Sequence, residues 1–237
     1  MRPLAILLYL LTILNLCVAT AQTFTRPSDA VPGAALHKYL STSEHDRELA
    51  GIGLEWDSRL GLHQTCSSHR VVKLTGLMIY VPVEFQSGSP HPVKGLWRER
   101  FSFERCGEIK TYNVLVSAQS AAQPRFAPLY PGDSLASPQL FLDARHSAFV
   151  LASVSLPRQN DGTPCQKISL LDTRVIRTPY EAFVPDRGMV RGVWDETWSV
   201  GGCGGVSEQL VTFTPDGKGG TYFTFGKSPN PASQPTR

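Results

Sequence analysis

Two glutamates, Glu99 and Glu196, each lie two residues after a tryptophan and two residues before a second aromatic residue. Side chains alternate between the two faces of a strand, so each carboxylate joins a row of large apolar groups if these segments are strands. Such a row suits an aromatic-walled groove with a carboxylate at its floor, able to hold a cationic or hydroxyl-rich ligand. The candidate ligand-binding residues are Trp97, Glu99, Phe101, Trp194, Glu196 and Trp198.

The same pattern also suits a buried core, and we favour this interpretation. Each glutamate would then meet an arginine, a lysine or a cluster of amide donors, because an unpaired buried charge is costly. Alternatively, burial that raises the pKa of Glu99 or Glu196 would make either residue a general acid or base, as in an exported hydrolase. The sequence has no Gly-x-Ser-x-Gly, His-Glu-x-x-His or phosphate-binding glycine motif, so enzymatic activity stays an open question.

A stretch of thirteen residues occurs twice without a gap. Residues 95–107 are GLWRERFSFERCG and residues 192–204 are GVWDETWSVGGCG, at a constant offset of 97 positions. Six of the thirteen positions are identical, and they include Trp and Cys, which are rare residues. The stretch therefore predicts a duplicated module with the two glutamates at equivalent positions.

The start of the chain has the parts of a secretory signal peptide. Met1 and Arg2 precede an apolar run over residues 4–16, and Ala19 and Ala21 are the small residues that signal peptidase requires. We predict cleavage before Gln22, which removes residues 1–21. The apolar run is short for a membrane span, and we expect no membrane span after cleavage. The expected location is secreted or periplasmic.

The cysteines that remain after cleavage are Cys66, Cys106, Cys165 and Cys203. In an exported chain, four thiols favour two disulfides, for which three connectivities exist. If each copy of the module keeps its own bond, the pairs are Cys66–Cys106 and Cys165–Cys203. Each would close a loop of roughly 40 residues, worth on the order of 4 kcal/mol in the loop-entropy model. Crossed pairings, which would tie the copies together, are the alternative.

His63 and His69 flank Cys66 at equal spacing, which resembles a run of metal ligands. The segment around Cys165 has no histidine, and a cysteine committed to a disulfide is not available as a thiolate ligand. We therefore expect neither a metal site nor a cofactor.

A helix is expected before the first cysteine of each copy. One should begin at Ser41, with Glu44 completing a capping box, and the other at Asp143. Cys-Gly at the end of the repeated stretch suits a tight reversal, because glycine tolerates the positive φ of such turns. The expected strand segments are 70–74, 77–85, 96–103 and 111–116, then 167–171, 174–176, 190–200, 209–214 and 221–225.

These elements predict an α+β fold with two tandem copies of a disulfide-stapled module, each a short helix packed on an antiparallel sheet. An all-β sandwich is the alternative. The expected organisation is a signal peptide over 1–21, a loose segment over 22–35, module 1 over 36–116, a linker over 117–138, module 2 over 139–225 and a loose tail over 226–237.

Composition narrows the class of partner. The chain has 237 residues and a formal net charge of +3, with the basic residues scattered along it. Nucleic-acid binders gather basic residues on one face, so nucleic acid is not an expected partner. We predict an exported, non-catalytic binding or interaction protein, whose partner is an unknown protein or small-molecule ligand.

Overall fold

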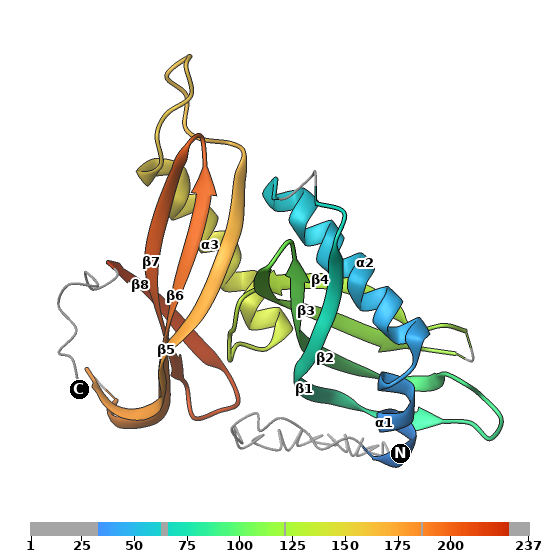
Figure 1. The fold of residues 1–237 in the computed structure, drawn as a ribbon. Coiled ribbons are helices and arrows are strands. Elements are labelled where there is room, and N and C mark those ends of the chain that lie inside the picture. The colour runs from blue at the N-terminus through green and yellow to red at the C-terminus, as the bar shows by residue number, and fades with distance from the viewer. Residues whose placement is uncertain (1–32, 63–65, 121, 186, 228–237) are drawn as a thin grey trace, which may run out of the picture.

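A computed structural model describes residues 33–62, 66–120, 122–185 and 187–227. The predicted signal peptide, its cleavage site before Gln22 and most of the two predicted loose end segments lie outside these residues. Within them, the chain forms three helices and two four-stranded antiparallel sheets (Figure 1). No helix in the described ranges combines the length and the apolar character needed to cross a membrane.

The first half of the chain forms a helical segment followed by a meander of four strands. Its elements are α1 (Ala34–Leu40), α2 (Ser43–Leu60), β1 (His69–Phe85), β2 (Pro92–Arg105), β3 (Glu108–Ala118) and β4 (Arg125–Pro131). The strands pair in the order β1-β2-β3-β4. Helix α2 lies across this sheet (Figure 1).

The second half has the same order of elements without the short first helix. Its elements are α3 (Pro138–Ser155), β5 (Ile168–Val184), β6 (Gly188–Gly202), β7 (Gly205–Pro215) and β8 (Thr221–Lys227). The strands pair in the order β5-β6-β7-β8. Helix α3 contacts all four of these strands. A helix packs on each sheet, and the chain therefore belongs to the α+β or β-rich class.

Both long helices begin at other residues than the sequence pattern predicts. Helix α2 is capped by Thr42, whose hydroxyl accepts a hydrogen bond from the amide of His45, because the hydroxyl of Ser41 donates to the carbonyl of His37 in α1. Helix α3 begins at Pro138 rather than Asp143. A proline suits the first position of a helix, where the missing N–H has no partner to lose.

The Cys-Gly pairs form the two-residue turns that the sequence predicts. Residues 106–107 join β2 to β3, and residues 203–204 join β6 to β7. Both residues of each turn have positive φ, as a type I′ hairpin turn requires. Cys106 (φ 44°) and Cys203 (φ 49°) are the only residues other than glycine with positive φ in the part of the chain that the structure describes.

Each half also contains one disulfide, Cys66–Cys106 in the first and Cys165–Cys203 in the second. These are the pairs that the repeat predicts, and the crossed pairings are not formed. Each bond ties the turn after the tryptophan-bearing strand to the segment that follows the helix. Cys165 is 2% exposed and belongs to the apolar core of the second half, whereas Cys106 is exposed.

The segment 117–138, expected to be a linker, contains the whole of β4 and the first residue of α3. The expected loose ends are also partly structured, because α1 begins at Ala34 and β8 extends to Lys227. β4 is an edge strand that pairs only with β3, and its two prolines, Pro128 and Pro131, are tolerated there. The first half thus extends beyond residues 36–116, the bounds predicted for module 1.

Two separate clusters of buried apolar side chains form the cores of the two halves. The first lies between α1, α2 and the sheet β1–β4, and it includes Trp97 and Phe101. The second lies between α3 and the sheet β5–β8. It also takes in Leu129, Tyr130 and Ala136, which come from β4 and the loop after it. The end of the first half therefore completes the core of the second.

Candidate functional site

Glu99 lies inside the first core with both carboxylate oxygens engaged. Its Oε1 accepts a hydrogen bond of 2.6 Å from the indole Nε1 of Trp97, and its Oε2 lies 2.8 Å from Nε2 of His45 on α2. None of the Glu99 surface is exposed, and His45 is 1% exposed. The carboxylate therefore joins the helix to the sheet and has no exposed surface.

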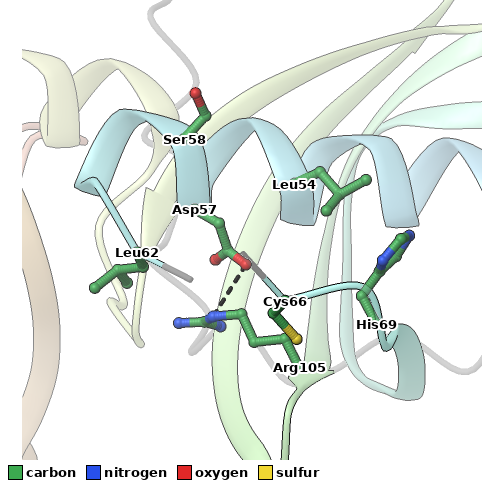
Figure 2. A pocket seen from close by; sticks show the side chains of 7 residues that line it. All are labelled: Leu54, Asp57, Ser58, Leu62, Cys66, His69 and Arg105. Atoms are coloured by element: carbon green, nitrogen blue, oxygen red, sulfur yellow. Dashed lines mark ion pairs between the residues drawn. The ribbon is translucent and has the colours of Figure 1, made fainter. Parts of the chain in front are cut away.

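A second polar group of the first half lies at a pocket. Arg105, the last residue of β2, is 1% exposed, and its Nε lies 3.0 Å from Oδ2 of Asp57 on α2. The other oxygen of Asp57 accepts a hydrogen bond of 2.5 Å from the hydroxyl of Tyr112. Figure 2 shows the pocket beside this ion pair, with Cys66 and His69 on its other side.

We call this cavity the Arg105 pocket. Its volume is about 250 Å³, and it is lined by Leu54, Asp57, Ser58, Leu62, Cys66, His69 and Arg105. Neither Nη1 nor Nη2 of Arg105 has a hydrogen-bond partner among the residues that the structure describes. The pocket thus contains a buried guanidinium with two nitrogens that make no hydrogen bond.

Glu196 is the most completely hydrogen-bonded carboxylate of the second half. Its Oε1 accepts hydrogen bonds from the hydroxyl of Ser134 (2.9 Å), the amide of Leu135 (2.8 Å) and the indole of Trp194 (2.9 Å). Its Oε2 accepts one of 2.8 Å from the indole of Trp198. The side chain is fully buried, and burial raises its pKa above the ordinary value of 4.5, although the four donors oppose this shift.

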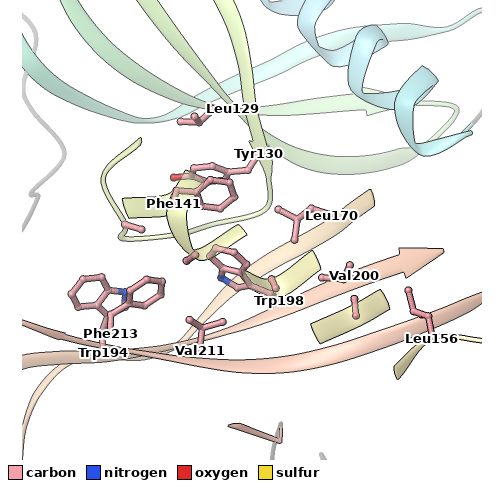
Figure 3. Close-up of a cluster of buried hydrophobic side chains, with 14 of the residues drawn as sticks. Leu129, Tyr130, Phe141, Leu156, Leu170, Trp194, Trp198, Val200, Val211 and Phe213 are labelled. Carbon is pink, nitrogen blue, oxygen red and sulfur yellow. The ribbon is translucent and has the colours of Figure 1, made fainter. Parts of the chain in front are cut away.

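The aromatic residues around Glu196 are packed against one another (Figure 3). The ring of Trp194 stacks on Phe213 with centroids 4.7 Å apart, and the ring of Phe141 lies 4.8 Å from Trp198 and 4.1 Å from Tyr130. All six candidate residues of the repeated strands have 0% exposure. The structure places three of them in each core, so Glu99 and Glu196 do not share a site.

The two halves meet along β4, the loop after it and β5. The amide of Asp133 donates to the carbonyl of Thr173 (2.8 Å), and the hydroxyl of Thr173 donates to the carbonyl of Pro131 (2.8 Å). Gly132 lies so close to β5 that a Cβ atom there would be 2.1 Å from the carbonyl oxygen of Thr173. Only glycine fits this contact. The backbone of Gly132 also has a positive φ of 86°, which favours glycine.

A second pocket lies beside this contact, and we call it the inter-half pocket. Its volume is about 280 Å³, and α2, β4, α3 and β5 all contribute to its lining. The lining residues are Trp56, Arg59, Leu60, Leu129, Arg145, Phe149, Ile168, Ser169 and Leu170. Pockets that bind small molecules are commonly found at such junctions and have mostly apolar walls with a few polar groups.

The polar groups of the inter-half pocket are donors. Trp56 is 7% exposed, and its indole Nε1 has no hydrogen-bond partner in the described ranges. Arg59 lies over the ring of Trp56 at 5.4 Å and pairs with Glu55. Arg145 lies over the ring of Phe149 at 5.9 Å and has no ion pair with any described residue. Together these groups favour an anionic head group above an apolar wall.

The sequence reasoning missed both pockets. The lining residues of the inter-half pocket come from four elements and are spread over residues 56–170, so no local spacing marks them. The Arg105 pocket had a weak signal, because position 105 differs between the two copies of the repeat, Arg in one and Gly202 in the other. Of the predicted metal-ligand run, His63 lies outside the described residues, and His69 is exposed at the Arg105 pocket.

No group of three or more His, Cys, Asp or Glu side chains in the described part of the chain is arranged to hold a metal ion. Comparison of the chain with models of known protein families, with curated proteins and with solved structures finds no significant match.

Proposed function

We propose that the chain is an exported, non-catalytic binding protein, built from two copies of one module, that holds a small amphipathic anion in the inter-half pocket. The observation that carries the proposal is the guanidinium of Arg145, which lines this pocket and has no ion pair with any described residue. An anionic head group bound in the pocket would supply the missing partner.

The walls and charges of the pocket support the class of ligand. Leu129, Phe149 and Leu170 supply apolar surface from both halves. Arg145 supplies a positive charge without a carboxylate partner in the described part of the chain, and arginine is well suited to bind a carboxylate or phosphate oxygen pair. A molecule with a short apolar chain and an anionic head meets both requirements. The volume suits a small ligand or the end of a larger one.

The duplication is supported by the register of the two sheets. Trp97 pairs with Val116, and Trp194 pairs with Phe213, so the offset of 97 residues holds on both strands of the hairpin. The positive φ of cysteine at the same turn position in both halves adds to this, because that conformation is unfavourable for any residue except glycine.

In this proposal the repeated glutamates are structural. Each is buried and fully engaged, which supports a folding role shared by both modules. The alternative, an exported hydrolase that uses Glu99 or Glu196 as general acid or base, is less well supported, because substrate and water would have to reach carboxylates with no exposed surface. Export itself rests on the signal-peptide pattern, and the intact mass of the exported chain should correspond to a start at Gln22.

The proposal is tested by titrating the oxidised, exported chain with octanoate while tryptophan emission is recorded, since Trp56 lines the pocket. We expect a saturable change. 1-Octanol has the same apolar chain without the charge and should bind about tenfold more weakly, the value of one charge-assisted hydrogen bond.

Two arginine variants locate the binding. Arg145→Gln should weaken octanoate binding about tenfold and leave 1-octanol binding unchanged. Arg174→Gln is the control, because Arg174 is exposed on β5 and does not line the pocket. Absence of saturable octanoate binding, or equal octanoate affinity in both variants, would contradict the proposal.

A further inference from the structure

The guanidinium of Arg105 is buried without enough acceptors. Asp57 pairs with Nε on one edge of the guanidinium, and Nη1 and Nη2 make no hydrogen bond with any described residue. The nearest other carboxylate is that of Glu108, whose Oε2 lies 4.0 Å from Nη2, beyond hydrogen-bond distance, on a side chain that is 65% exposed. Burying a charged donor in this state is costly, so the arrangement calls for a reason other than packing.

The second half shows that the module does not need this arginine. The position equivalent to Arg105 is Gly202, at the end of β6 and beside the same Cys-Gly turn. A Cβ atom at Gly202 would lie 2.5 Å from the carbonyl oxygen of Lys167, 2.9 Å from the sulfur of Cys165 and 3.4 Å from Leu156. The second half therefore leaves no room for a side chain at the position of Arg105.

Each carboxylate oxygen of Asp57 has a partner without any contact to Nη1 or Nη2 of Arg105. Tyr112 donates to one oxygen of Asp57, and Nε of Arg105 lies against the other. The edge formed by Nη1 and Nη2 is therefore left without a hydrogen-bond partner among the described residues, although both nitrogens are buried. Such an edge can bind two oxygens of one anion side by side when the residues of the pocket give access to it. Ser58 and His69, which also line the pocket, offer further donors at its mouth.

We propose that the Arg105 pocket is a binding site for a small oxyanion group, of the phosphate, sulfate or carboxylate type, held by Nη1 and Nη2 of Arg105. This site is separate from the inter-half pocket, and the two share no lining residue. It exists only in the first half. The second half, with glycine at the equivalent position, has no guanidinium there to bind an anion.

The experiment is a titration of the oxidised chain with inorganic phosphate, sulfate and acetate at constant ionic strength, followed by NMR chemical shifts of the arginine side chains and by the thermal midpoint. Glycerol 3-phosphate is added to tell free phosphate from a phosphate carried on a larger molecule. We expect saturable binding of at least one of these anions and a rise in the thermal midpoint, because a ligand that binds only the folded state stabilises it.

Three variants change the affinity in stated directions. Arg105→Lys should weaken binding about tenfold or more, since an ammonium cannot offer two parallel donors. Ser58→Asp, at an exposed position of α2, should weaken it about fivefold through repulsion, with no loss of stability. Glu108→Gln removes a competing carboxylate and should strengthen binding about twofold to fivefold.

Arg174→Gln is the matched control, because Arg174 is exposed on β5 and lines neither pocket, and this variant should bind the anions like the wild-type chain. If no anion binds saturably, the Arg105 pocket holds only solvent and the proposal is wrong. It is equally wrong if Ser58→Asp and Glu108→Gln leave the affinity unchanged. These two exposed substitutions keep the test decisive even if Arg105→Lys does not fold.

Discussion

His45 and Glu99 form a polar contact inside an otherwise apolar core, with Nε2 of the histidine 2.8 Å from Oε2 of the glutamate. The histidine lies in the first turns of α2 and the glutamate in the middle of β2. Because neither side chain reaches solvent, the contact fixes how the helix is placed on the sheet. In the second half the same carboxylate position is served by Ser134 and Leu135, which precede the helix.

The first prediction concerns this contact. Glu99→Gln should lower the free energy of unfolding by about 1–5 kcal/mol, because the buried side chain of His45 then loses the carboxylate that faces it. Chemical denaturation of the oxidised chain measures it. Glu84→Gln is the control. Glu84 lies on β1 and forms an exposed ion pair with Lys94, so this variant should leave the stability unchanged within error. Equal stability of Glu99→Gln and wild type would contradict a structural role.

The second prediction concerns the pH dependence that Glu196 adds to stability. Burial raises the pKa of this carboxyl in the folded chain above 4.5, so the folded state favours the protonated form. Stability from this group is therefore fully present below pH 4.5 and is lost as the pH rises through the raised pKa. Glu196→Gln cannot titrate. The stability of wild type relative to this variant should thus be greatest in acid and should decrease toward neutral pH.

Denaturation of both proteins between pH 4 and pH 8 checks this, because the other titrating groups cancel in the difference. A difference that grows with rising pH would mean that the four donors outweigh burial and that the pKa of Glu196 is lowered.

The third prediction concerns the junction of the two halves. Gly132→Ala places a methyl group against the carbonyl of Thr173, whereas Gly88→Ala adds one in open space at a similar φ of 80°. Both variants bear the cost of a left-handed backbone, so their difference isolates the close contact. Gly132→Ala should be less stable than Gly88→Ala by about 1–3 kcal/mol. Calorimetry of the two proteins measures the difference, and equal melting would show that the halves are not held together at this point.

The fourth prediction concerns the order in which the disulfides are reduced. Cys106 is exposed and Cys66 lines the Arg105 pocket, whereas Cys165 is buried in the second core. A limiting amount of a thiol reductant should therefore open Cys66–Cys106 first, because attack requires access to a sulfur atom. Alkylation followed by peptide mapping identifies the free thiols. Cys165 and Cys203 appearing first, or all four appearing together, would contradict the expected order.

The parts of the fold that could be predicted from the sequence are those with strong local or repeated signals. The Cys-Gly turns were predictable because glycine tolerates the positive φ of a tight reversal, and the repeat then selected the disulfide pairs. The burial of Glu99 and Glu196 followed from alternation along a strand. A single stretch of chain carried each of these signals.

What escaped prediction depends on contacts between distant segments. The composition of residues 117–138, rich in Ala, Ser, Gln and Pro, predicts a linker where the structure has β4. Pro128 and Pro131 are acceptable in this strand only because it lies at the edge of the sheet. The donors from Ser134 and Leu135 to Glu196 depend on how the halves meet, as does the inter-half pocket. No spacing within one element encodes such contacts.

The loop after β4 also determines how the chain can be divided. A fragment that begins at residue 139 would retain β5–β8 but would lose the first residue of α3, and it would lose Leu129, Tyr130 and Ala136 from its interior. It would also leave Glu196 with the two indole donors alone. A fragment for expression of the second half by itself should therefore begin before β4. A cut at that point removes β4, the edge strand, from the first half. The two halves share one segment, so separate production of both requires that segment to be present twice.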